Sequence, residues 1–204
     1  MRCAWLLVAT GLLVAGCGSS SAGPTTTTTT HTRTFAGNAL TPPRTAPPIV
    51  LRDAEGKPVT LAAQRGRYVL VTFLYTHCPD VCPLIAANLN QAVRQLGPSA
   101  RDVRVLAVSV DPKGDTPAAV HAYTRAKHLV PQFEYLIGTA AQLRRVWAAY
   151  DVLAVSRKAD LVDHIAYTAL VDPSGRERVL YDAHVRARQV VHDLHLLMRR
   201  EAPA

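Results

Sequence analysis

Two cysteines, Cys78 and Cys82, are the residues of this sequence whose type and spacing best suit chemistry. They lie in the segment YTHCPDVCP, residues 75–83, between an apolar run and a helical pattern. Four residues apart near a helix start, their side chains share one face, with Cβ atoms roughly 5–6 Å apart. The helix N-terminus favours the thiolate, which is both the nucleophile and the metal ligand. The pair therefore predicts a site for Cu(I), although two thiolates also suit zinc.

A structural disulfide is the competing interpretation of this pair, because exported proteins often carry one. A disulfide that closes so short a loop removes little entropy from the unfolded chain. A domain of this size also has enough hydrophobic core to be stable without a disulfide. A general thioredoxin-type oxidoreductase has a CxxC spacing, one residue shorter than the spacing here. A peroxidase of the peroxiredoxin type is disfavoured because Val71 and Tyr75 stand where its PxxxTxxC motif needs proline and threonine. We therefore favour a metal-binding or redox-active dithiol.

The elements around the cysteines are predicted to alternate between strands and helices. Residues 68–75 form a continuous β-branched and aromatic run, typical of a strand buried on both faces, and an apolar helical face follows Pro83. Further strands are predicted at 103–110, 133–137, 165–171 and 178–181, and further helices at 117–127, after Thr139 and at the end of the chain. This order predicts an α/β fold, a three-layer sandwich with a mixed central sheet and a C-terminal β-hairpin plus helix.

The last helix shows which of its residues we expect in the core. Its predicted core stripe consists of Val190, Val191, Leu194 and Leu197, whereas Arg186, Arg188, Asp193 and Arg199 are expected to face water.

The first residues of the chain predict export. Arg2 precedes an apolar run that is too short to span a membrane, so residues 1–16 are expected to be a signal peptide. The tetrad Val14-Ala15-Gly16-Cys17 resembles a bacterial lipobox, which predicts lipidation of Cys17 and a place on the extracytoplasmic face of the bacterial cell membrane. The Thr/Pro/Ser-rich residues 17–48 are expected to form a disordered tether, which leaves 49–204 as one domain.

Charge narrows the choice of partners. The chain has 23 Lys and Arg against 15 Asp and Glu, a modest excess that favours anionic headgroups or an acidic partner. The basic residues are scattered and no Lys/Arg block is interleaved with aromatics, so nucleic-acid binding is not expected.

The cysteine segment resembles the signature of the Sco/SenC family of copper-binding proteins. Later segments resemble the family's landmarks in the family's order, over nearly all of residues 49–200: SVDP at 109–112, DTP at 115–117, GT at 138–139, DH at 163–164 and LVDPSG at 170–175. The resemblance implies a thioredoxin-like fold and copper held by two cysteines and a distant histidine, here Cys78, Cys82 and His164. It also implies copper delivery to the dinuclear copper site of cytochrome c oxidase subunit II, with that subunit and other copper chaperones as partners.

His164 is the third ligand that the resemblance implies. It directly precedes the strand predicted at 165–171, and in a thioredoxin-like sheet the start of that strand lies against the cysteine loop. An imidazole would let a trigonal site hold Cu(I) and tolerate Cu(II). Asp80 and Asp163 flank the ligands. They could orient the ligands by hydrogen bonding without coordinating the metal themselves. The alternative is that their side chains only cap turns.

Three other histidines compete less well for a metal. His77 adjoins Cys78 and is expected to point away from the site or to contact a partner. His192 and His195 have a helical i, i+3 spacing that can bind zinc, but no further ligand lies near them in sequence, so we expect them to face solvent.

Two functions follow from these residues. The first is a copper chaperone, which is not an enzyme. The second is a thiol–disulfide reductase that keeps the copper-binding cysteines of the oxidase reduced. The reductase needs Cys78 and Cys82 as its redox-active pair but does not need His164.

Overall fold

The structure, a computed structural model, describes residues 34–152, 154–157, 161–164 and 166–201, which belong to one compact unit. The predicted signal peptide 1–16, Cys17 and the tether up to residue 33 lie outside the described residues. Within the described ranges, no helix has the length and apolar character needed to cross a membrane.

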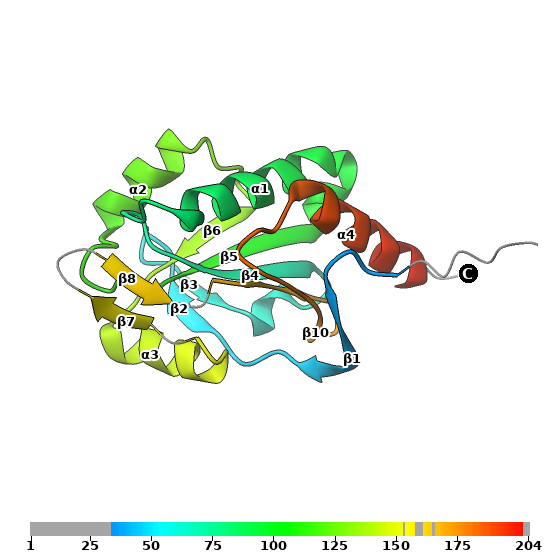
Figure 1. The fold of residues 1–204 in the computed structure, drawn as a ribbon, viewed down its shortest axis with the longest axis horizontal. Coiled ribbons are helices and arrows are strands. Elements are labelled where there is room, and N and C mark those ends of the chain that lie inside the picture. Colours follow the sequence, from blue (N-terminus) through cyan, green and yellow to red (C-terminus); the bar gives the residue numbers. More distant parts are fainter. Residues whose placement is uncertain (1–33, 153, 158–160, 165, 202–204) are drawn as a thin grey trace, which may run out of the picture. The chain divides into compact units, whose positions relative to one another are not determined.

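A six-stranded mixed sheet forms the centre of the domain, with the order β1-β10-β9-β4-β5-β6 (Figure 1). Its parallel half consists of β4 (Tyr68–Leu74), β5 (Val103–Ser109) and β6 (Phe133–Leu136). Its antiparallel half consists of β9 (Thr168–Val171), β10 (Arg176–Tyr181) and β1 (Asn38–Thr45). Every residue of β4 is buried, as its continuous apolar run predicts.

Helices cover both faces of this sheet. Figure 1 shows α1 (Val81–Gln95), α2 (Pro117–Ala126) and α4 (Ala187–Glu201) on one face and α3 (Ala140–Ala149) on the other. The predicted caps are confirmed: the Thr116 side chain accepts a hydrogen bond from the Ala119 N–H, and Thr139 forms a capping box with Gln142. The predicted three-layer architecture is therefore confirmed.

Shorter elements connect the layers. They are the 3-10 helices η1 (Ala62–Gln64) and η2 (Gly97–Asp102) and two small hairpins, β2 (Val50–Arg52) with β3 (Pro58–Thr60) and β7 (Ala154–Arg157) with β8 (Leu161–His164). The predicted hairpin of β9 and β10 is also present, and Gly175 takes a φ of +78° in its turn.

The strand predicted at 165–171 is wrong at its start. Here β9 begins at Thr168, and His164 instead pairs with Ala154 at the end of β8. Tyr167, which precedes β9, donates a hydrogen bond from its hydroxyl to the Tyr150 carbonyl at the end of α3, at 2.6 Å. His164 therefore closes a separate hairpin rather than opening a strand of the central sheet.

The predicted boundary between tether and domain is also wrong. Instead of starting at residue 49, the domain includes β1, which pairs antiparallel with β10 at the edge of the sheet from Asn38 to Thr45. The side chains of β1 are largely exposed, so this strand needs few apolar residues and its composition resembles that of a linker. Backbone pairing, which composition does not reveal, includes it in the sheet.

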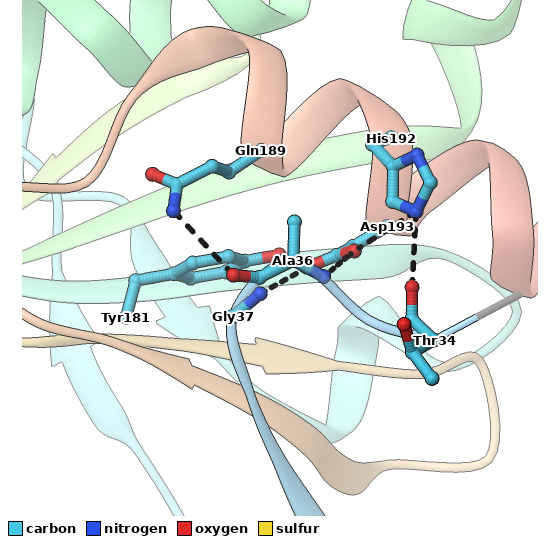
Figure 2. Close-up of polar contacts among 7 residues, drawn as sticks. All are labelled: Thr34, Ala36, Gly37, Tyr181, Gln189, His192 and Asp193. Atoms are coloured by element: carbon cyan, nitrogen blue, oxygen red, sulfur yellow. Dashed lines mark hydrogen bonds and ion pairs between the residues drawn. The ribbon is translucent and has the colours of Figure 1, made fainter.

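Asp193 of α4 corrects a further expectation, because it is fully buried rather than facing water. Its carboxylate accepts hydrogen bonds from the Ala36 N–H at 2.7 Å, the Gly37 N–H at 3.0 Å and the Tyr181 hydroxyl at 2.8 Å (Figure 2). Positions 190, 193, 194 and 197 repeat the spacing of a buried helix face, which turns Asp193 inward. A buried carboxylate thus fastens the N-terminal segment of the domain to α4 and β10.

Candidate metal centre

The two cysteines lie where β4 passes into α1, as predicted. Cys78 is in the connecting loop and is 9% exposed, whereas Cys82 is the second residue of α1 and is fully buried. Both are free thiols. The helix begins at Val81, before rather than after Pro83, and the proline is tolerated there because first-turn N–H groups have no partner within the helix.

A shared proton distinguishes the two thiols. The Cys82 S–H donates a hydrogen bond to the Cys78 sulfur, which lowers the pKa of Cys78 to about 6. The Cys82 backbone N–H also donates to that sulfur, at 3.4 Å. The same thiol–thiol bond, followed by burial, raises the pKa of Cys82. At neutral pH Cys78 is therefore the thiolate and Cys82 the thiol.

This assignment predicts the pH profile of Cys78 alkylation in the reduced, metal-free protein. Because the thiolate is the nucleophile, the rate should follow the deprotonated fraction, rise through a midpoint near the pKa of about 6 and level off by about pH 7. Iodoacetamide labelling, read by mass spectrometry, measures this rate. Cys78→Ser is the matched control, and in it the burial of Cys82, which is 0% exposed, should keep labelling low over the same range. A midpoint above about pH 8, the ordinary value for a cysteine, would contradict the assignment.

Asp115 fixes the loop that carries Cys78. Its buried carboxylate accepts hydrogen bonds from both the backbone N–H and the hydroxyl of Thr76, each at 2.8 Å. It also accepts from the Ser109 hydroxyl at 2.6 Å and from the Tyr135 hydroxyl at 3.1 Å. Burial raises the pKa of Asp115. From the sequence we placed Asp115 only at a helix start; the structure shows that it joins the ends of β4, β5 and β6 behind the cysteines.

A buried hydroxyl lies near the same site. The Tyr123 hydroxyl has no hydrogen-bond partner within the described part of the chain, and its ring packs edge-on against Tyr135 with centroids 5.9 Å apart. Burial raises the pKa of Tyr123, and the charges of Cys82 and Cys78 raise it further, in that order. The described part of the chain thus holds a buried hydroxyl without a hydrogen-bond partner, whose pKa depends on the two cysteines. Nothing in the sequence pattern singled out this residue.

The remaining predicted site residues lie at the same end of the domain. His164 and Asp163 are in β8, paired with Ala154 and Val155, and their side chains are outside the described ones. Figure 1 shows the β7–β8 hairpin at the end of the domain where α1 begins. Asp80 is exposed at the N-cap of α1 and makes no side-chain cap bond, so turn capping does not account for its side chain. Its backbone hydrogen-bonds the Cys78 sulfur.

The other histidines do not build a site among the described side chains. There, no three His, Cys, Asp or Glu residues lie close enough together to hold a metal ion. His77 is exposed, and its Nδ1 lies 3.0 Å from the Thr76 hydroxyl. His192 is also exposed, as predicted, and its Nε2 lies 3.1 Å from the Thr34 carbonyl.

Comparison with known proteins decides between the families that such a dithiol allows. The model of the SCO1/SenC family matches residues 38–199. The chain belongs to the SCO1/SenC family. The match begins at β1, in agreement with the corrected start of the domain.

Individual relatives of this SCO1/SenC protein agree in sequence and fold. The mitochondrial SCO2 homolog of Bos taurus is 37% identical over 145 residues, which cover 68% of this chain and 53% of that protein, about half of its length. The structure of Bradyrhizobium japonicum ScoI with copper bound is 33% identical, covers 74% of this chain and 98% of its own, and gives a TM-score of 0.66. The apo Sco1 protein of Thermus thermophilus is 34% identical, with coverages of 82% and 99% and a TM-score of 0.71. The domain therefore has the thioredoxin-like fold of the Sco proteins.

Proposed function

We propose that this SCO1/SenC protein binds one copper ion and helps to load it into the dinuclear copper site of cytochrome c oxidase subunit II. The observation that carries the proposal is the thiolate–thiol pair at the start of α1, in which one sulfur is already ionised at neutral pH. The copper-bound relative from Bradyrhizobium japonicum supports the choice of metal. Subunit II and other copper chaperones are the proposed partners.

The proposed ligands are the sulfurs of Cys78 and Cys82 and the imidazole of His164. Two soft sulfurs in mutual contact suit Cu(I), and coordination by Cys82 requires the release of its proton. The hydrogen bonds that Thr76 donates to the Asp115 carboxylate hold the loop before Cys78 in place as the ion enters and leaves. Asp80 and Asp163 remain proposed partners that orient the ligands from outside the metal's shell.

Oxidation of the pair provides the experiment. Joining Cys78 and Cys82 in a disulfide removes both thiolates, so the oxidised protein should hold no copper while the reduced protein holds one ion per chain. Equilibrium dialysis of both forms against Cu(I) under anaerobic conditions, with Cys78→Ser as a form that cannot make the disulfide, measures this difference. Equal copper in the oxidised and reduced forms would reject the proposed site.

A thiol–disulfide reductase is the second candidate function, because the same pair has the arrangement of a nucleophile and a resolving thiol. The pKa of Cys78 is lowered to about 6, and the more deeply buried Cys82 donates its backbone N–H to the Cys78 sulfur. In that role Cys78 would attack a disulfide of the oxidase and Cys82 would release the mixed disulfide, leaving the oxidase cysteines reduced and this pair oxidised.

We also propose that the domain works at the extracytoplasmic face of the bacterial cell membrane, held by lipid on Cys17. The lipobox-like tetrad that ends at this cysteine supports the anchor. The full-length protein is expected in the membrane fraction, and Cys17→Ala should release it or leave it unprocessed. Fractionation combined with mass spectrometry of the N-terminus measures both outcomes. A Cys17 without lipid, in a protein that still fractionates with membranes, would contradict the anchor.

A further inference from the structure

The outer face of α4 carries a row of basic side chains. Arg188, His192, His195 and Arg199 follow the spacing i, i+4, i+7 and i+11, which places them on one side of the helix, opposite the buried Val190, Leu194 and Leu197. We call these four residues the α4 basic stripe. Arg188, His192 and Arg199 are exposed, and His195 is half-buried.

Acidic residues do not neutralise the two arginines of this stripe, although the Nε2 of His192 lies 3.9 Å from the Oδ1 of Asp193. Asp193 is the only acid between Ala187 and Arg200, and its carboxylate is buried and bonded to the N-terminal segment. Among the described side chains, neither Arg188 nor Arg199 forms an ion pair with an acid. The stripe therefore presents two permanent positive charges, those of Arg188 and Arg199, with two imidazoles between them.

The chain enters the domain beside this stripe. Asp193 holds the backbone of Ala36 and Gly37, and His192, a member of the stripe, contacts the Thr34 carbonyl (Figure 2). The guanidinium of Arg200 lies 5.2 Å from the centre of the Phe35 ring. Because these contacts fix residues 34–37 along α4, the described part of the chain begins next to the basic stripe.

Resting on the lipid anchor proposed for Cys17, we propose that the α4 basic stripe contacts anionic phospholipid headgroups of the membrane that holds this anchor. The charge of the stripe complements the headgroup phosphates, and a chain that enters beside the stripe holds it close to that surface. An acidic protein is the competing occupant, and the experiment includes the oxidase to distinguish it from lipid.

This contact would orient the metal centre. Figure 1 shows α4 extending toward one end of the domain and the start of α1, which carries Cys82, at the other end. With α4 on the membrane, the cysteine end is presented away from the lipid, toward a partner that projects from the same surface. The stripe therefore acts on the orientation of the domain and not on copper binding.

Histidine footprinting on vesicles tests the proposal. The full-length protein is mixed with vesicles of phosphatidylcholine alone or with about one third phosphatidylglycerol, and diethylpyrocarbonate labelling of each histidine is read by mass spectrometry. We expect labelling of His192 and His195 to fall roughly threefold or more with the anionic vesicles and to recover in about 0.5 M salt. His121, a half-buried residue of α2 whose Nδ1 lies 3.6 Å from the Glu55 carboxylate, should be labelled equally in all samples.

Charge-reversed variants separate this surface from general electrostatics. Arg188→Glu with Arg199→Glu should abolish the protection, whereas Arg144→Glu with Arg145→Glu, the same charge change at exposed positions of α3 on the other face of the sheet, should retain it. Circular dichroism checks that both variants are folded. Equal labelling in neutral and anionic vesicles, or protection that survives in the α4 variant, would overturn the proposal. Protection that appears only when detergent-solubilised oxidase is added would assign the stripe to a protein and would equally overturn it.

Discussion

Replacing Cys78 by serine should leave a folded protein that binds almost no copper. The serine hydroxyl is a hard, protonated group at neutral pH, so Cu(I) loses the sulfur that is already ionised in the native pair. Replacing a residue that only hydrogen-bonds a metal ligand typically lowers metal affinity by about 10- to 100-fold. Replacing the ligand Cys78 itself should therefore weaken Cu(I) binding by at least roughly 100-fold. Competition with a chelator of known affinity measures the change.

The fold should be nearly indifferent to this substitution. Cys78 precedes α1, and serine occupies a similar volume, so thermal unfolding should stay close to that of the native protein. Cys17→Ser, the same chemical change outside the described domain, is the matched control and should bind copper normally. A Cys78→Ser protein with native Cu(I) affinity would show that the metal binds elsewhere.

The His164→Ala variant should separate copper transfer from redox chemistry. The two thiolates should still hold Cu(I), more loosely, while Cu(II) loses its only nitrogen ligand and should be bound far more weakly. Disulfide exchange depends on the thiolate of Cys78 rather than on a third ligand, so its rate should stay within about twofold of the native rate. Copper titration in both oxidation states and exchange with a small disulfide measure these effects in one preparation.

His121→Ala is the matched control for this variant, because His121 lies on α2, outside the proposed ligand set, and its loss should affect neither assay. An unchanged Cu(II) affinity in His164→Ala would remove His164 from the proposed ligand set. A collapse of the exchange rate would instead tie His164 to the reductase chemistry and would count against its role as a simple ligand.

Several features of the domain could be predicted because they depend on local pattern. The buried strand at 68–74 follows from an unbroken apolar run, and the caps at Thr116 and Thr139 follow from side chains that satisfy nearby N–H groups. The position of both cysteines between that strand and α1 follows from the same pattern. These predictions needed no knowledge of distant contacts.

Other features depend on residues that are far apart in the sequence. β1 belongs to the sheet through backbone pairing with β10, and its polar side chains conceal that role. Asp193 is a helix residue whose partners, Ala36 and Gly37, lie more than 150 positions away. A charged residue is normally expected on the solvent side, and only these distant donors explain its burial.

The candidate site also combines features that the sequence predicts with features that depend on distant contacts. The sequence identifies Cys78 and Cys82, but the shared proton that distinguishes them depends on their geometry and burial. Asp115 could be recognised as the start of a helix, whereas its bonds to Thr76 and Tyr135 required the three parallel strands to end side by side. Burial of such a carboxylate is possible because every bond it makes is to a donor.

The copper content of cytochrome c oxidase in cells that carry His164→Ala, compared with cells that carry Cys78→Ser, tests the proposed copper transfer most directly. If this SCO1/SenC protein delivers copper through all three ligands, both variants should leave the dinuclear site largely unmetallated, although His164→Ala retains its disulfide-exchange rate. A fully metallated dinuclear site with His164→Ala, beside an empty one with Cys78→Ser, would contradict copper transfer and leave the reductase function in its place.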